Sequence, residues 1–259
     1  MGNSNQRRFS VGLDLGGAQI SVSVYDHARR CSIPLDIDGE KTLTAAVAIE
    51  GTGDVAIVGA RAEKRSGKKS ATVFTGWRQM LYGMADEWEE HCEEIEEKWH
   101  FNTAPGGKSA PRAYALAQEG QQVSLAGIVG HLVEAVCASL LEHGPQVDAH
   151  EEVHFDAFAV AVPECLTPPQ REVVLSAVEG TVKSRLGGHI VVTAVNEPLC
   201  AALQLCSIPP VLLVDWGASK LSVSVFELRM VGGEAGEVVL EEVVSRSNVF
   251  VSGAEVEWQ

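Results

Sequence analysis

The sequence predicts an α/β protein with mixed sheets flanked by helices, and three observations support this class. Segments typical of strands dominate both ends of the chain, strands and helices alternate in the part that begins near residue 124 and ends near residue 206, and one strand–turn–strand segment occurs twice. The chain has 259 residues, 46% of them hydrophobic, which is enough to bury a sizeable core in one or two domains.

The repeated segment is LDLGGAQISVSVYD at 13–26 and VDWGASKLSVSVFE at 214–227. Asp14 corresponds to Asp215 and Gly16 to Gly217, and each copy follows an apolar run. Apolar and small polar residues alternate after each turn, as in a half-buried strand. Because the match extends over about a dozen positions, an internal duplication is favoured over chance similarity between two ordinary hairpins.

An Asp-x-Gly turn between two strands suits the binding of phosphate and magnesium. A glycine allows a tight turn in which successive N–H groups point into a concavity that binds phosphate oxygens. An aspartate at the end of a strand supplies the carboxylate oxygen that Mg²⁺ prefers. Two such hairpins that face each other are predicted to hold a polyphosphate–Mg²⁺ unit between them.

Further elements are expected along the chain from residue periodicity and helix-capping residues. The segment 86–99 is an amphipathic helix with an acidic face, and Thr167 is the N-cap of a helix with proline in its first turn. The expected helices are 71–83, 86–99, 124–143, 167–186 and 198–206, and the expected strands include 43–50, 54–59, 158–163, 189–198 and 237–245.

The bulk properties exclude several classes. A net charge of −15 disfavours direct nucleic-acid binding and anionic membrane surfaces. The six cysteines form no CxxC pair, the N-terminus lacks the apolar segment of a signal peptide, and no apolar run is judged long enough to span a membrane. A reducing, cytoplasmic location is therefore expected. Gly107-Lys108-Ser109 is not a phosphate loop, because its upstream glycine is missing.

With these features in place, the sequence resembles the nucleotide-binding domain of the seventy-kilodalton heat-shock (Hsp70) proteins, within the actin-like ATPase superfamily with its ribonuclease H-like fold. The similarity runs in order along nearly the whole chain. The segments that carry it are VGLDLGGAQISVSVYD, AVAIEGTGDVAIVGARAEK, TVFTGWRQMLYG, FAVAVPECLTPPQREVVLSAVEG, VVTAVNEPLCAAL, VLLVDWGASKLSVSVFEL and VFVSGAEVEW.

The resemblance implies lobe I over residues 1–208, with a small subdomain at about 40–122, and a truncated start of lobe II over 209–259. It also implies ATP or ADP and Mg²⁺ as cofactors. Asp14 and Asp215 would hold the metal, and Glu197, Asp215 and Arg78 are the candidate catalytic residues. The implied phosphate-binding residues are Gly16, Gly17, Ala18, Gly217, Ala218, Ser219 and Lys220.

The chain departs from the family pattern at residues that bear on chemistry. Gly17 and Ala18 replace two threonines whose hydroxyls bind phosphate, and the side chains of Ala218 and Ser219 are expected to crowd a turn that favours glycine. Trp77 falls at the position of the essential lysine. Phosphoryl transfer needs a positioned cation, so hydrolysis should be slow unless the neighbouring Arg78 substitutes after a local shift.

Lys220 has two interpretations: it donates to phosphate, or it is a solvated strand residue. For the whole chain, the first hypothesis is a divergent chaperone or co-chaperone domain in protein folding and the stress response, which binds ATP–Mg²⁺ with hydrolysis weak or absent. Its expected partners are a J-domain protein or another chaperone, as in ribosome-associated complexes, and unfolded peptide through a further domain. The alternatives are an active ATP-hydrolysing chaperone and an interaction module that binds no nucleotide.

Overall fold

The computed structural model describes residues 6–50, 55–68, 71–82, 102–103, 114–116, 122–205, 211–231 and 237–248. The chain divides into two compact units by its internal contacts. Unit 1 comprises 1–160 and 167–193, and unit 2 comprises 161–166 and 194–259. The structure is mixed α/β with several separate sheets, as the sequence predicts.

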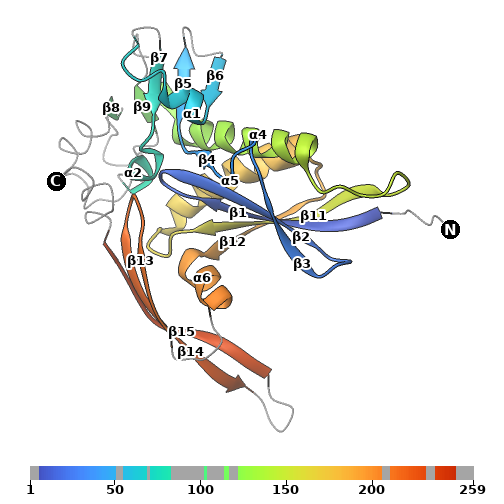
Figure 1. Ribbon diagram of the computed structural model, residues 1–259. Helices are drawn as coiled ribbons and strands as arrows, with labels where there is room; N and C mark the ends of the chain where they lie inside the picture. Colours follow the sequence, from blue (N-terminus) through green and yellow to red (C-terminus); the bar gives the residue numbers. More distant parts are fainter. Residues whose placement is uncertain are drawn as a thin grey trace. The chain divides into compact units, whose positions relative to one another are not determined.

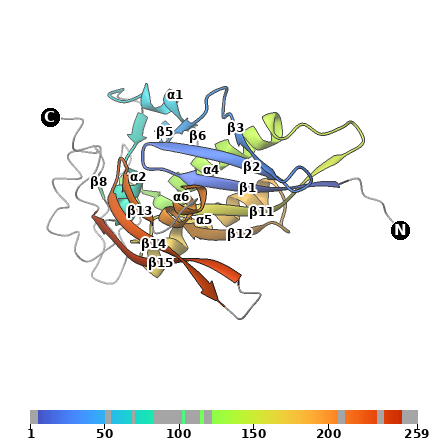
Figure 2. The same ribbon diagram turned by 60° about the horizontal axis from the view of Figure 1, so that its bottom comes forward.

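The main sheet of unit 1 has the strand order β12-β11-β1-β2-β3, with β4 also paired to β2 (Figures 1 and 2). Every second residue of β1 and β2 is buried, because successive side chains of a strand point to opposite faces. The inward set is Phe9, Val11, Leu13, Leu15, Ile20, Val22 and Val24. The strands are β1 (Gln6–Leu15), β2 (Gln19–Asp26), β3 (Cys31–Leu35), β4 (Leu43–Thr44), β11 (Glu152–Val162) and β12 (Val191–Asn196).

Two long helices of unit 1, α4 (Leu125–His143) and α5 (Pro168–Arg185), pack against each other (Figure 1). Both predicted starts are confirmed. The Ser124 hydroxyl accepts from the Gly127 N–H at 2.9 Å, and the Thr167 N–H donates to the Gln170 side chain at 2.7 Å. The buried residues of α5 are spaced by four, as expected for one apolar stripe.

A smaller sheet of unit 1 has the order β6-β5-β7, from β5 (Val47–Glu50), β6 (Val55–Val58) and β7 (Ala71–Phe74). The short helix α1 (Ala60–Glu63) follows β6 and buries Ala62 against Ala46 and Ala48. The prediction of one helix over 71–83 is wrong in its first half, because 71–74 pair with β5 and only α2 (Trp77–Tyr82) is helical. The run Ala71–Phe74 is half buried and suits an edge strand as well as a helix.

A third small sheet has the order β10-β9-β8, from β8 (Asn102–Thr103), β9 (Tyr114–Leu116) and β10 (Gln122–Ser124). The predicted acidic helix over 86–99 and the segment 249–258 lie outside the described residues.

Unit 2 contains α6 (Glu197–Leu205) and a sheet of β13 (Val211–Trp216), β14 (Leu221–Val231) and β15 (Glu237–Asn248) in that order (Figure 2). One face of this sheet carries serines, including Ser222 and Ser224, which are buried. The resemblance implies a start of lobe II at residue 209. By their contacts, α6 and the segment 161–166 group with β13 in unit 2.

One helix within the described residues, α4, is long and apolar enough to span a membrane, with a mean hydropathy of 1.6. The sequence-based statement that no run reaches this length is therefore wrong. Half of that helix is buried inside the protein, and its buried residues include Leu132 and Val133.

Candidate functional site

The two copies of the repeated segment form hairpins with the same register. In the first, Asp14 pairs with Ser21 and Leu15 with Ile20 across β1 and β2. In the second, Asp215 pairs with Ser222 and Trp216 with Leu221 across β13 and β14. In each copy, the aspartate lies one residue before the last paired residue of its strand. A four-residue turn then follows, which comprises residues 16–19 in the first copy and 217–220 in the second. The predicted duplication is confirmed at the level of strand pairing.

The glycines at the two turn entrances have different surroundings. A Cβ on Gly16 would lie 2.0 Å from the carbonyl oxygen of Gln19, so the backbone approach there requires glycine. A Cβ on Gly217 would lie 3.7 Å from the Lys220 carbonyl oxygen, which is an ordinary contact. In the second turn the Gly217 N–H donates to this same oxygen at 2.9 Å.

The expectation that Ala218 and Ser219 crowd the second turn is wrong. Neither residue has a positive φ, so the turn does not use the backbone conformation that favours glycine. Ser219 is buried, and the turn accommodates its side chain.

Two neighbouring residues of α2 contact the first turn. The indole Nε1 of Trp77 donates to the Gly16 carbonyl oxygen at 3.1 Å, and Nε of Arg78 donates to the Leu15 carbonyl oxygen at 2.8 Å. Both side chains are buried. A bulky indole and a long guanidinium thus reach adjacent carbonyl oxygens of one turn from consecutive positions of α2.

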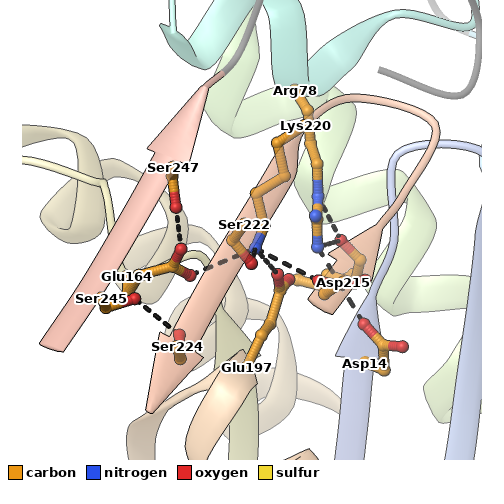
Figure 3. Close-up of polar contacts among 11 residues, drawn as sticks. Asp14, Arg78, Glu164, Glu197, Asp215, Lys220, Ser222, Ser224, Ser245 and Ser247 are labelled. Atoms are coloured by element: carbon orange, nitrogen blue, oxygen red, sulfur yellow. Dashed lines mark hydrogen bonds and ion pairs between the residues drawn. The ribbon is translucent and has the colours of Figure 1, made fainter. Parts of the chain in front are cut away.

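Arg78 also approaches the aspartate of the first hairpin. A terminal guanidinium nitrogen of Arg78 lies 4.0 Å from Oδ1 of Asp14, whose side chain is 56% exposed. Asp14 and Arg78 are both labelled in Figure 3. The structure thus brings together Asp14, Gly16 and Arg78, for which the resemblance implies metal-binding, phosphate-binding and catalytic roles respectively.

In unit 2, the second hairpin supplies a buried lysine to a cluster of acidic side chains. The Lys220 side chain is 1% exposed, and Nζ lies 3.1 Å from Glu164, 3.3 Å from Glu197 and 3.3 Å from Asp215 (Figure 3). Nζ also donates to the Ser222 hydroxyl at 3.1 Å. The interpretation of Lys220 as a solvated strand residue is therefore wrong. We call Lys220, Glu164, Glu197 and Asp215 the lysine–carboxylate cluster.

The cluster keeps the lysine charged. Burial by itself lowers the pKa of Lys220, but the fields of Glu197, Glu164 and Asp215 and the hydrogen bond to Glu164 outweigh it, so the pKa lies above its ordinary value. Glu164 is further held by the Ser247 hydroxyl, which donates to its other oxygen. A hollow of about 660 Å³ in unit 2 lies beside Glu164 and is lined by polar groups that include Asn196, Ser245 and Ser247.

The residues of the second hairpin do not fit the role of magnesium ligands. Mg²⁺ requires oxygens at about 2.0–2.1 Å in near-octahedral geometry. Asp215 and Glu197 instead share an ammonium group, and a divalent ion beside that ammonium would be repelled by it. No group of three or more acidic, histidine or cysteine side chains suited to a metal ion occurs in the part of the chain that the structure describes.

Sequence reasoning missed Glu164 and the positioning role of Trp77. Glu164 follows β11 and lies 56 residues before Lys220, so no local pattern joins them. A charged residue directly after a buried strand was the only sequence feature that marked it. In comparisons with known proteins, no family model matches the chain, and no curated protein matches it.

Proposed function

We propose that this chain is the nucleotide-binding region of a divergent Hsp70-type chaperone or co-chaperone, with the actin-like ATPase fold. It binds ATP through the turns 16–19 and 217–220 and hydrolyses it slowly or not at all. The observation that carries the proposal is the identical register of the two hairpins, with Asp14 opposite Ser21 and Asp215 opposite Ser222. Duplicated turns at the ends of strands are a means of presenting backbone N–H groups to phosphate.

The contacts of α2 support the part of the proposal that ATP is hydrolysed slowly or not at all. Catalysis of phosphoryl transfer depends on a cation that is free to stabilise charge on the transferring group. Trp77 occupies the expected lysine position and is fully buried, and two guanidinium nitrogens of Arg78 donate to the Leu15 carbonyl oxygen. The groups that would meet the transition state are thus used within the protein.

The magnesium part of the proposal is confined to the first hairpin. Asp14, whose side chain is more than half exposed, is the residue that would hold Mg²⁺ or its water shell. When bound, the metal would neutralise phosphate charge. Glu197 and Asp215 hold Lys220 instead, so the proposal assigns them no metal and no attacking water.

The biological setting follows from the resemblance and extends the proposal. The region would act in the cytoplasm in protein folding and the stress response, beside a J-domain protein or another chaperone, including in ribosome-associated complexes. Unfolded peptide would bind through a separate domain, and direct contacts with nucleic acid or membrane are not proposed because the net charge is −15.

One observation favours a second candidate function, an interaction module without nucleotide. The two buried cations near the aspartates, Arg78 and Lys220, both have partners inside the protein. Proteins that bind triphosphates usually direct such cations to the phosphate oxygens. In this alternative the hairpins are retained for their packing alone.

Calorimetric titration with ATP, with excess Mg²⁺ and separately with EDTA, tests the proposal. We expect a Kd of about 0.1 mM or weaker, added hydrogen-exchange protection at both turns, and single-turnover hydrolysis close to the uncatalysed rate. Asp14→Asn should remove any Mg²⁺ dependence, whereas Asp36→Asn, at an exposed residue of the same unit, should leave it intact. Fast turnover would support the active chaperone instead, and no binding at millimolar ATP would support the interaction module.

A further inference from the structure

Unit 1 contains a hollow of about 590 Å³ between the inner face of its main sheet and the C-terminal end of α4. Its walls are mostly apolar, and the strands β1, β2 and β3, which lie side by side in Figure 2, supply one of them. That wall is formed by Phe9, Val24, Ile33, Pro34 and Leu35. Ligand sites of proteins commonly have about 300–1,000 Å³ and a mostly apolar lining, so the hollow has the size and character of a small-molecule site.

The hollow lies where α4 ends. The helix ends at His143, Gly144 follows as an extended C-cap, and Pro145 cannot continue the helical hydrogen bonds. Beside this end the apolar face of the sheet changes from closed to accessible. Val24 of β2 is 2% exposed, whereas Ile33, its pairing partner on β3, is 38% exposed. An apolar ligand would therefore bury sheet surface that the protein itself leaves in contact with water.

One of the charged groups that line the hollow, Asp26, is already balanced by the protein. Its side chain is 1% exposed and accepts from a guanidinium nitrogen of Arg7 at 2.6 Å. Its other oxygen accepts from the backbone N–H groups of Ala28 and Arg29. This carboxylate therefore offers little to a ligand cation.

The guanidinium of Arg29, by contrast, is available at the mouth of the hollow. It is 61% exposed, and its Nε lies 3.8 Å from Asp26, which is too far for a hydrogen bond. Among the described residues, this guanidinium has no hydrogen-bonded partner. Asp36 also lies on the rim, but it is exposed and its charge is screened by water and salt. The mouth thus carries one positive group whose planar fork of donors matches a carboxylate.

We propose that this hollow binds a small monocarboxylate with an apolar body, of the kind of a medium-chain fatty acid. The apolar body lies against Phe9, Val24 and Leu35, and the carboxylate accepts hydrogen bonds from Arg29. A carboxylate is favoured over a phosphate because one guanidinium pairs with two oxygens of one anionic group, and the net charge of −15 repels a dianion more strongly than a monoanion.

The site goes beyond the proposed function, because it lies at the other end of the first hairpin from the turn 16–19. Phe9 pairs with Asp26 at the hollow, whereas Leu15 pairs with Ile20 at the turn. At about 3.4 Å per residue, the two places are about 20 Å apart along β1. Binding in the hollow therefore does not rest on nucleotide binding.

The test is a titration of the ¹⁵N-labelled full chain with sodium octanoate up to about 3 mM, followed by the amide chemical shifts of 33–39 and 143–146. We expect saturating shifts there with a Kd of about 1 mM or tighter. Octan-1-ol has the same chain without the charge and should bind about tenfold more weakly, because it cannot form the charge-assisted bonds to Arg29.

Charge variants test the role of the guanidinium. Arg29→Gln should weaken octanoate binding about tenfold and leave octan-1-ol binding unchanged. Arg30→Gln removes the same charge from the next residue, which is exposed and does not line the hollow, and should change octanoate binding by less than about twofold. Asp36→Asn should bind octanoate at least as tightly as the natural chain, because it removes a negative charge from the rim.

Shape variants test the hollow without changing any charge. Ile33→Trp fills part of the space and should abolish the binding of both octanoate and octan-1-ol. Ser32→Trp places the same side chain on the opposite face of β3, since successive residues of a strand point to opposite faces, and should leave binding intact. Ile33 is partly exposed on an edge strand, so this exchange is compatible with folding.

Three results would overturn the proposal. One is the lack of octanoate-dependent shifts at 33–39 and 143–146 in the natural chain. Another is equal octanoate binding by Arg29→Gln and the natural chain. The third is binding of octyl phosphate or octyltrimethylammonium as tightly as octanoate, which would contradict a monocarboxylate as the ligand. All three readouts are made without ATP, so failure here is distinguishable from failure of the proposed function.

Discussion

The indole Nε1 of Trp77 donates a hydrogen bond to the carbonyl oxygen of Gly16 at 3.1 Å. This bond links α2 to the turn of the first hairpin, at the position where the Hsp70 resemblance expects a catalytic lysine. Trp77 is 1% exposed and is among the largest fully buried side chains of the described residues. Trp77 thus fixes the turn by packing and by one hydrogen bond.

We therefore predict that Trp77→Lys destabilises the protein and confers no ATP turnover. An ammonium at this buried place would lose its hydration without a carboxylate partner of the kind that Lys220 has, at a cost of about 3 kcal/mol or more. Trp77→Phe keeps most of the packing and loses the hydrogen bond, which should cost about 1–2 kcal/mol. Urea unfolding and single-turnover hydrolysis provide the measurements. A Trp77→Lys chain that is fully stable and hydrolyses ATP would show that α2 is a catalytic element.

The two turn glycines give a second prediction, in which each is the control for the other. Gly16→Ala places a Cβ 2.0 Å from the Gln19 carbonyl oxygen and must distort the turn, at a cost of about 2 kcal/mol or more. Gly217→Ala meets its nearest atom at 3.7 Å and should change stability by less than about 1 kcal/mol. Hydrogen exchange at each hairpin reports the effect locally. Equal effects in both copies would contradict the difference in turn packing described above.

The repeat and the long elements could be predicted from the sequence because they depend on local patterns. The alternation of apolar and polar residues located β2 and β14, an amphipathic pattern located α4, and a capping residue, Thr167, located the start of α5. The surroundings of Lys220 could not be predicted, because they depend on Glu164 and Glu197, which approach it only after α6 and β13 have packed. For the same reason the roles of Trp77 and Arg78 at the first turn were not evident.

A third prediction concerns acid stability through the ion pair of Arg7 and Asp26. A guanidinium nitrogen of Arg7 donates to Asp26 at 2.6 Å, and this hydrogen bond, aided by the N–H groups of Ala28 and Arg29, holds the pKa of the buried Asp26 below its ordinary value. A lowered pKa in the folded state stabilises the protein above the unfolded-state pKa of about 4, and this stabilisation is lost as the pH falls through that value toward the folded one.

The difference in unfolding free energy between the natural chain and Asp26→Asn should accordingly be largest near neutral pH and shrink below about pH 4. Urea unfolding at neutral pH and at about pH 3 measures this difference. Asp36→Asn, at an exposed residue of the same unit, is the control and should show little difference at either pH. A difference for Asp26→Asn that is constant with pH would mean that the ionised carboxylate contributes nothing through Arg7.

The fourth prediction uses Cys137 of α4 as a probe of unit 1. Its side chain is fully buried among the core residues of the helix, and burial raises the pKa of its thiol to about 12. The thiolate is the reactive form, so both access and ionisation oppose modification. Cys31 of β3 is exposed in the same unit and supplies an internal reference.

We expect N-ethylmaleimide at about pH 8 to modify Cys137 at least about a hundredfold more slowly than Cys31 in the folded protein, and at a similar rate in urea. Peptide mass spectrometry after timed quenching resolves the two sites. Because Cys137 becomes reactive only when α4 separates from its neighbours, its rate reports the opening free energy of the core around α4, which packs against α5 and α2. If Cys137 reacted as fast as Cys31 under native conditions, α4 would not be a closed core helix.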